Sequence, residues 1–407
     1  MKAGWESKKL GAFAALVSTG PFGSVLHKSD YVDKGVPLVN PINLVGERIV
    51  PDPTKLIDKL TTKRLNNYVL QEGDIVVGRR GEIGRCAVVG ADESGWVCGT
   101  GSFFIRPLPT TNSQFLAHLI RSDSYREKLE HASTGATMKN MSNSTLSDLI
   151  VAIPPLPEQQ RIVTLLDEAF DGIATAKANA EKNLLNARAL FKSYRQSVLS
   201  QRGEVWLDKS LGELCDIKHG FAFKSEFFVE SGRHVLLTPG NFYESGGYRD
   251  RGEKQKYYAA GIPKGFVLAE GDLLVAMTEQ AAGLLGSPIL VPESGKFLHN
   301  QRLGLVTPKS GVAWANEYFF HVFNTEAVRH AIHASATGVK VRHTSPTKIG
   351  EVKVSFPSSV SEQLELVGRL LEFEQETQRL ESIYQQKLAA LDELKKSLLH
   401  QAFSGAL

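Results

Sequence analysis

The sequence lacks the short motifs that mark common active sites. No Gly-x-Ser-x-Gly nucleophile turn, His-Glu-x-x-His zinc pair or EF-hand loop occurs along its 407 residues. The nearest match to a phosphate-binding loop, around Gly295, has Leu290 in place of the first glycine and Phe297 in place of the required Ser or Thr. His330 and His333 lie three residues apart on an expected helix, but no third metal ligand is near them. We therefore expect no catalysis, no cofactor and no metal on this chain.

Long apolar runs and cysteines are also scarce. No stretch is apolar for long enough to cross a membrane, and the short apolar patch at residues 11–17 has no signal-peptide cleavage pattern behind it. The three cysteines, Cys86, Cys98 and Cys215, lack metal-ligand spacing, and their odd number leaves an unpaired thiol, as in a reducing compartment. These absences predict a cytoplasmic protein without membrane contact.

A large excess of charge of either sign is missing as well. The net charge is only +3, which gives no bulk field to attract a polyanion. Any site for nucleic acid must therefore come from local clusters of basic residues.

The sequence does contain a long heptad pattern, present twice. Across residues 157–201, apolar or small residues recur at alternating steps of three and four, with one stutter-like extra step of four. The same positions 204 residues later are again mostly apolar, and Glu158-Gln159 returns as Glu362-Gln363 (363 − 159 = 204). A shared irregularity at a constant offset indicates internal duplication and two long helices paired as an antiparallel coiled coil. The predicted seam consists of Ile162, Leu166, Ala169, Ile173, Ala176, Ala180, Leu184, Ala187, Phe191, Tyr194 and Val198, then Leu366, Leu370, Phe373, Thr377, Leu380, Tyr384, Leu388, Leu391, Lys395, Leu398 and Ala402.

Each long helix follows a globular segment, and the two globular segments repeat one another loosely. Both contain a Gly/aromatic turn, an Asn turn (Asn40 and Asn241), a buried strand, one helix, a glycine loop and a short strand ending in proline. Short strands mixed with helices predict an α+β fold with a mostly antiparallel or mixed sheet. The expected helices cover residues 113–131 and 315–333, and the glycine loops cover 133–137 and 335–339. The predicted divisions are 1–156 (the first head), 157–203 (the first long helix), 204–357 (the second head) and 358–407 (the second long helix).

Two related heads without catalytic residues suggest a protein that binds something twice. Duplex DNA suits this organisation, because equivalent positions on one face of the duplex recur every helical turn, roughly 34–36 Å. A duplicated coiled-coil adaptor that binds only protein would explain the seam equally well, and for any single polar residue ordinary surface exposure remains an alternative. The candidate DNA contacts, chosen from polar and basic loop positions, are Lys28, Asn40, Asn43, Arg79, Arg80, Thr137, Lys139, Asn140, Lys218, Lys224, Asn241, Thr278, Lys340 and Arg342.

Two stretches resemble the conserved regions of type I restriction–modification specificity subunits. The first is Pro155-Leu156-Pro157-Glu158-Gln159-Gln160-Arg161-Ile162-Val163, which leads into a long helix, and the second is the ending Lys395-Lys396-Ser397-Leu398-Leu399-His400-Gln401-Ala402-Phe403-Ser404-Gly405. The second helix start departs from this pattern, because Ser358-Ser359-Val360-Ser361 precede Glu362-Gln363 without a proline.

This resemblance implies a bipartite double-stranded DNA site. Each head would be a target-recognition domain that reads one half-site, and the helices would set the gap and dock two methyltransferase subunits. Those subunits would bind S-adenosylmethionine, and two motor-nuclease subunits that use ATP and Mg²⁺ would join for cleavage. The chain itself would hold no cofactor.

Overall fold

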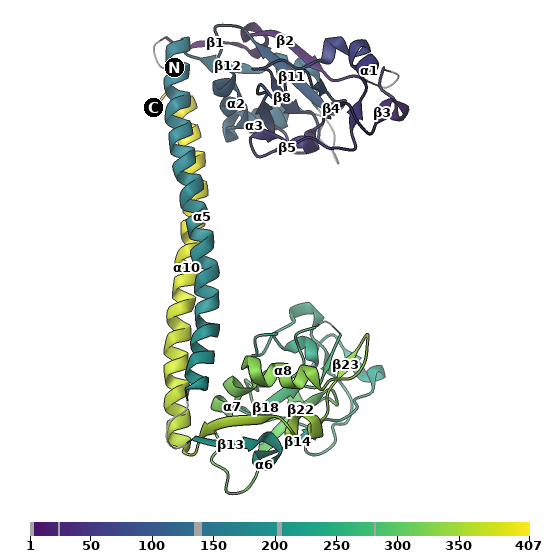
Figure 1. Ribbon diagram of the computed structural model, residues 1–407, viewed down its shortest axis with the longest axis vertical. Helices are drawn as coiled ribbons and strands as arrows, with labels where there is room; N and C mark the ends of the chain where they lie inside the picture. The colour runs from purple at the N-terminus through teal and green to yellow at the C-terminus, as the bar shows by residue number, and fades with distance from the viewer. Residues whose placement is uncertain (1–3, 23–24, 134–140, 202–205, 281) are drawn as a thin grey trace. The chain divides into compact units, whose positions relative to one another are not determined.

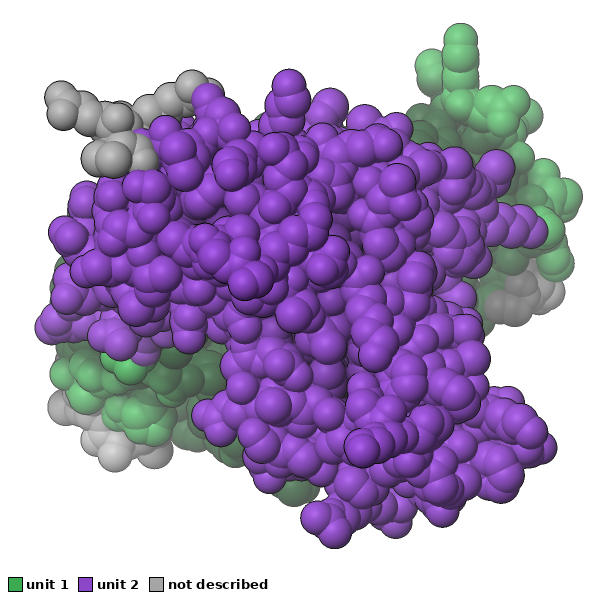
Figure 2. All heavy atoms as spheres, turned by 90° about the horizontal axis from the view of Figure 1, so that it is seen from below, with its two compact units in different colours: residues 1–181, 385–407 green, residues 182–384 purple. Residues whose placement is uncertain are grey.

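The computed structural model describes residues 4–22, 25–133, 141–201, 206–280 and 282–407, and its ribbon is drawn in Figure 1. The chain forms two compact units, which are coloured separately in Figure 2. Unit 1 comprises residues 1–181 and 385–407, and unit 2 comprises residues 182–384. Each unit contains one head and a part of each long helix.

Both heads are built on the same four-stranded antiparallel sheet. Its strand order is β2-β11-β8-β9 in unit 1 and β14-β22-β18-β20 in unit 2, so the topology is repeated strand for strand. One of the two inner strands of each sheet, β8 in unit 1 and β18 in unit 2, is wholly buried and is called the central strand below. The bounds are β2 Ala14–Thr19, β11 Ser102–Pro107, β8 Ile75–Gly78, β9 Cys86–Val88, β14 Cys215–His219, β22 Leu303–Pro308, β18 Leu273–Ala276 and β20 Pro288–Leu290.

A second four-stranded sheet in each head contains one parallel pair. The orders are β10-β4-β7-β3 and β21-β16-β17-β15, with β4–β10 and β16–β21 parallel. The prediction of an α+β fold with mixed sheets is therefore confirmed. The bounds are β3 Tyr31–Val32, β4 Val36–Val39, β7 Leu56–Ile57, β10 Val97–Cys98, β15 Phe228–Val229, β16 His234–Leu236, β17 Tyr257–Tyr258 and β21 Phe297–Leu298.

A strand pair closes each head where the chain enters and leaves it. β1 (Glu6–Lys9) pairs antiparallel with β12 (Ile150–Ile153), and β13 (Trp206–Ser210) pairs in the same way with β24 (Lys353–Pro357). Smaller pairs are β5 (Leu44–Val45) with β6 (Arg48–Ile49) in unit 1 and β19 (Thr278–Glu279) with β23 (Arg342–His343) in unit 2.

Two consecutive helices in each head replace the single helix expected from the sequence. In unit 1 they are α2 (Ser113–Arg121) and α3 (Asp123–Ala132), and in unit 2 α7 (Asn316–Phe323) and α8 (Glu326–Ala334). The chain breaks at Ser122, whose backbone is extended and whose hydroxyl donates to the Leu119 carbonyl. Polar residues that bond nearby backbone groups end a helix in this way. The short helices are α1 Lys59–Arg64, α4 Asn143–Ser147, α6 Leu211–Leu214 and α9 Pro346–Gly350.

The two long helices are α5 (Leu156–Ser200) and α10 (Val360–Ser404), each of 45 residues. All but one of the predicted seam positions are buried or half-buried, which confirms the heptad pattern. Leu380 is the exception at 37% exposure. In the described residues no helix is apolar over a length sufficient to cross a membrane.

Contacts within each unit show that the helices run antiparallel. In unit 2, Arg188 pairs with Glu381 at 3.1 Å, and further along α5 the Tyr194 ring stacks on Phe373, which lies earlier on α10. In unit 1, Lys177 pairs with Asp392 at 2.7 Å. The core of the first head continues into the helix pair through α5 and α10 residues such as Ile162 and Phe403.

A buried glutamine fastens each long helix to its own head. Gln159 Oε1 accepts the Asn112 N–H at 2.7 Å, and its Nε2 donates to the carbonyls of Thr110 and Pro154. Gln363 does the same with the Ala315 N–H and with two carbonyls, those of Ala313 and Pro357. Both side chains are 1% exposed or less. The repeated Glu-Gln pair therefore marks a structural joint at the first turn of each helix.

Candidate nucleic-acid interface

In both heads the segment that follows the glycine loop lies beside the residue that follows the buried central strand. The Met141 N–H donates to the Arg79 carbonyl after β8 (3.2 Å), and the Thr344 N–H donates to the Met277 carbonyl after β18 (3.0 Å). This arrangement brings Arg79 and Arg80 to the end of the first loop. Three predicted contacts in that loop, Thr137, Lys139 and Asn140, lie outside the described residues.

In the second head the glycine loop is a hairpin with an exposed tip. Thr337 and His343 exchange backbone hydrogen bonds of 2.9 and 2.8 Å across its base. Gly338 has a φ of +102°, and a Cβ there would lie 2.1 Å from the Val341 carbonyl oxygen, so the turn requires glycine. Val339 at the tip is 98% exposed, and Lys340 beside it is exposed.

Arg342 supports this hairpin from inside. Its Nη1 lies 3.2 Å from Glu279 Oε1, and its Nη2 donates to the His333 carbonyl at 2.6 Å. The Glu279 carboxylate is 3% exposed, and its other oxygen accepts the three consecutive N–H groups from Gly283 to Leu285. The Arg342 guanidinium is therefore bonded within the protein, where it supports the hairpin. A contact between Arg342 and DNA stays a prediction.

Arg79 in the first head is also half-buried, whereas Arg80 is exposed. The Arg79 guanidinium lies 4.5 Å from the centroid of the Phe22 ring, and its Nε donates to the Met141 carbonyl at 3.0 Å. Burial, with a smaller effect of the Arg80 charge, lowers the pKa of Arg79 from its ordinary value. Arg79 therefore holds Met141, in the segment after the glycine loop, and Arg80 is the cation that faces solvent.

Two of the predicted asparagines are structural. Asn43 Oδ1 accepts the Asn40 N–H at 2.8 Å and its Nδ2 donates to the Val50 carbonyl, while Asn241 bonds the Thr238 N–H and the Arg249 carbonyl in the same way. Asn43 and Asn241 are 4% and 1% exposed. The counterpart of Asn241 is therefore Asn43, not Asn40, and these two amides hold a turn.

The remaining predicted cations lie on the surface. Lys28 is exposed in the short 3₁₀ turn Lys28–Asp30, Lys218 lies on β14 with its ammonium 4.9 Å from the Phe266 ring centroid, and Lys224 pairs loosely with Glu226 at 3.7 Å. Thr278 is half-buried on β19, opposite His343.

Sequence reasoning missed one exposed cation beside the second loop. The Arg302 carbonyl accepts the Met277 N–H at 3.0 Å, which places Arg302 next to Thr278 at the end of the central strand. The counterpart bond in the first head joins Arg79 N–H to the Gly101 carbonyl. This pairing spans the sheet and leaves no local signal in the sequence, so only the fold brings Arg302 to the loop.

Comparisons with known proteins agree with this duplicated architecture. The family model described as type I restriction modification DNA specificity domain matches twice, at residues 3–186 and 203–389. The chain is 24% identical to the EcoKI specificity subunit of Escherichia coli K12, over 93% of this chain and 83% of that protein. It is 24% identical to the StySPI specificity subunit of Salmonella potsdam, over 76% and 69%.

Two solved structures share the fold over the whole chain. One comes from work on complex assembly and conformational transition of the type I R-M system (TM-score 0.75, 19% identity, 100% of this chain and 99% of that chain). The other is the HsdS subunit from Thermoanaerobacter tengcongensis (TM-score 0.67, 18% identity, 100% and 98%). The double family match, carried by two heads of identical topology, shows that the chain belongs to the family of type I restriction–modification DNA specificity proteins.

Proposed function

We propose that the two heads read the two halves of a bipartite, asymmetric double-stranded DNA site, for a type I restriction–modification complex of which this chain is the specificity subunit. The observation that carries this proposal is that in both heads the segment after the glycine loop, at Met141 and at Thr344, lies beside the end of the buried central strand. Exposed cations accompany it in each head, Arg80 in the first and Lys340 with Arg302 in the second. Such groups bind phosphates or guanine edges.

The heads differ where they would meet DNA. Arg80 follows the central strand in the first head, whereas Thr278 occupies the corresponding place in the second. Different side chains on one scaffold are expected to read different bases, which supports an asymmetric site. The family match favours this reading over a coiled-coil adaptor that binds only protein.

The long helices are proposed to set the spacer between half-sites and to dock the partner subunits. We propose two methyltransferase subunits and two motor-nuclease subunits per chain, with S-adenosylmethionine, ATP and Mg²⁺ bound by those partners. The described residues contain no group of three or more His, Cys, Asp or Glu side chains placed to hold a metal ion.

A head exchange tests the proposal. Residues 4–153 are replaced by the matching head of a relative with a different DNA site, and the new joint is placed before Gln159 so that the helix anchor is kept. Adenine methylation is then mapped across the genome of a host that carries the complex. We expect one half-site to change and the other to stay.

The reciprocal exchange of residues 206–357 is the matched control and should change the other half-site. An active hybrid in which both half-sites change, or neither does, would contradict modular reading by the heads.

A further inference from the structure

The duplication has placed a corresponding cavity in each unit, next to the long helices. The cavity of unit 1 has a volume of about 670 Å³ and the cavity of unit 2 about 510 Å³. Each is lined by the loop after the Asn turn, by the last part of α2 or α7, by the start of α3 or α8, and by a long helix. His118 in one and His321 in the other occupy the sixth position of their helices.

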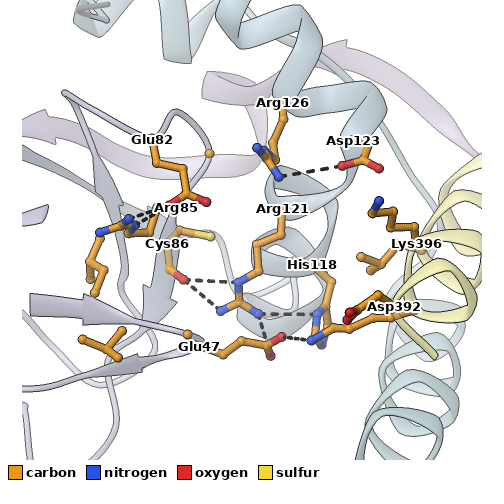
Figure 3. Close-up of a pocket in the computed structure, with 16 residues that line it drawn as sticks. Glu47, Glu82, Arg85, Cys86, His118, Arg121, Asp123, Arg126, Asp392 and Lys396 are labelled. Atoms are coloured by element: carbon orange, nitrogen blue, oxygen red, sulfur yellow. Dashed lines mark hydrogen bonds and ion pairs between the residues drawn. The ribbon is translucent and has the colours of Figure 1, made fainter. Parts of the chain in front are cut away.

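In unit 1 the basic side chains of this cavity are neutralised by the protein itself. Figure 3 shows Arg121 reaching Glu47, at 3.0 Å, and the carbonyl of Cys86. Lys395 of α10 reaches the same Glu47 carboxylate at 2.9 Å. Arg126 on α3 lies 3.8 Å from Asp123. No partner charge from outside is needed here.

In unit 2, two guanidinium groups of the cavity have no carboxylate partner of this kind. Arg195 on α5 is 8% exposed, and Arg329 on α8 corresponds to Arg126. Each donates to a backbone carbonyl, Arg195 Nη2 to Asn324 and Arg329 Nη2 to Gly283. Among the described residues, neither has a carboxylate oxygen within 4.0 Å. Arg195 takes the place that Leu399 holds in unit 1 (399 − 195 = 204).

Further polar atoms in the same cavity also lack partners. Arg329 Nη1, Asn324 Nδ2 and His321 Nδ1 are buried and make no hydrogen bond. Asn324 is 6% exposed and His321 4%. Burial, aided by the Arg195 charge, lowers the pKa of His321 to about 4, so its ring is neutral near pH 7.

The carboxylates that line the cavity do not form ion pairs with these two guanidinium groups. Glu326 is paired with Lys192 at 2.7 Å. Arg329 is attracted most by the buried Glu279, which does not line the cavity and is already bonded to Arg342 and to three backbone N–H groups, and less by Glu244. Arg195 is attracted by Glu374. Among the described residues, none of these carboxylates lies within ion-pair distance of either guanidinium. Burial lowers the pKa of Arg329 to about 10, which still leaves it charged near neutral pH.

Buried charges in folded proteins are ordinarily paired, because a desolvated guanidinium without an anion is costly. Planar guanidinium forks match the geometry of tetrahedral oxyanions, and an amide N–H₂ adds a further donor. We propose that the cavity of unit 2 binds one phosphate-type oxyanion between Arg195, Arg329 and Asn324. The source is either free inorganic phosphate or the terminal phosphate of a nucleotide. This proposal is independent of the proposed recognition of DNA by the heads. The residues that would bind the oxyanion all lie in unit 2 of this chain, and the test needs no DNA.

Calorimetric titration of the full chain with inorganic phosphate, in chloride buffer of matched ionic strength, tests this site. We expect one phosphate per chain and a rise in melting temperature with phosphate, because a ligand that binds only the folded state stabilises it. Arg329→Gln and Arg195→Gln should each weaken the affinity at least about tenfold, the loss expected for a charged hydrogen bond. Arg126→Gln, the matched change in unit 1, should leave it unaltered.

A parallel titration with ATP distinguishes the two sources. Binding at least about tenfold tighter than phosphate points to a nucleotide, and equal or weaker binding points to the free ion. Should either glutamine variant fail to fold, Arg329→Lys keeps the charge but removes the fork and should still weaken phosphate binding. The proposal is overturned if no phosphate binds up to about 20 mM, a concentration that would reveal any site of millimolar affinity, or if both arginine variants bind as tightly as the parent chain.

Discussion

Arg342 and Lys340 are two residues apart, but the structure indicates different roles for them, one in stability and one in DNA binding. Arg342→Ala removes one charged hydrogen bond to Glu279 and one to the His333 carbonyl. Hydrogen bonds to charged groups contribute about 1.5–3 kcal/mol each. The Arg342 side chain is 34% exposed, so solvent screening reduces that sum, and we expect a loss of about 2–4 kcal/mol. For a unit of this size the loss corresponds to a melting temperature roughly 5–15 °C lower.

Lys340→Ala should leave stability within about 0.5 kcal/mol, because the side chain is exposed at the hairpin tip. It should instead weaken DNA binding and lower the salt slope by about one unit, the signature of one lost phosphate contact. Lys177→Ala is the control, since Lys177 pairs with Asp392 between the long helices. Both properties are measurable on the same preparations, by denaturant unfolding and by salt titration of DNA affinity in the presence of the methyltransferase partner.

A double-mutant cycle of Arg342→Met with Glu279→Gln isolates the brace. We expect a coupling of at least about 1 kcal/mol, since the two groups are in direct contact. The reasoning fails if Arg342→Ala is as stable as the parent chain, or if Lys340→Ala costs as much stability as Arg342→Ala.

Three further predictions concern the joints, the buried histidines and the long helices. Gln159→Leu and Gln363→Leu should each cost about 2–4 kcal/mol, because each leaves a buried N–H and two carbonyls unpaired, and urea unfolding of the double variant should give additive losses. Burial lowers the pKa of His299 and of His321 to about 4, below the unfolded value of about 6.5. The unfolded chain therefore binds more protons, and stability should fall as pH drops from about 6.5 to 4, by up to about 3 kcal/mol for each histidine. His321→Asn should flatten this fall in pH-dependent unfolding, and an unchanged profile would contradict the assignment. A four-residue insertion near Ala180, matched near Ala389, adds about 6 Å and about 400° of rotation. The modified DNA sites should keep both halves with a spacer longer by about one base pair, or two, and an unchanged spacer in an active variant would show that the helices do not measure the gap.

The long helices and the duplication were predictable because they depend on local periodicity. A seam residue such as Ile162 or Leu370 can be recognised by its spacing from the next seam residue. A repeat at a constant offset can likewise be recognised without knowledge of the fold. The division of the expected helix into two helices in each head was harder to predict. Its only signal in the sequence is a polar residue at each break, Ser122 or Thr325. Such residues favour caps as well as surfaces, and only packing decides between them.

The candidate interface was harder to predict because polar residue types do not reveal their partners. Asn43 and Asn241 have the composition of base-reading residues, but each is buried in a turn that it holds together. Arg342 follows a glycine loop, as a phosphate-binding cation would, yet its guanidinium is bonded to Glu279, a residue 63 positions earlier. Pairing over such separations depends on strand register, which the loop sequence alone does not contain.

The strand pairs that close the heads have one more consequence. Within unit 1 the Phe115 ring contacts both Trp5, near the start of the chain, and Phe403, near its end. Near the end of α10, Phe403 thus packs in the core of the first head, as Leu199 near the end of α5 packs in the core of the second. In topological terms the polypeptide is nearly a ring, and the point at which it opens is arbitrary. A chain that starts at Trp206, runs through a short linker from Leu407 to Gly4 and stops at Gln201 should fold into the same two units.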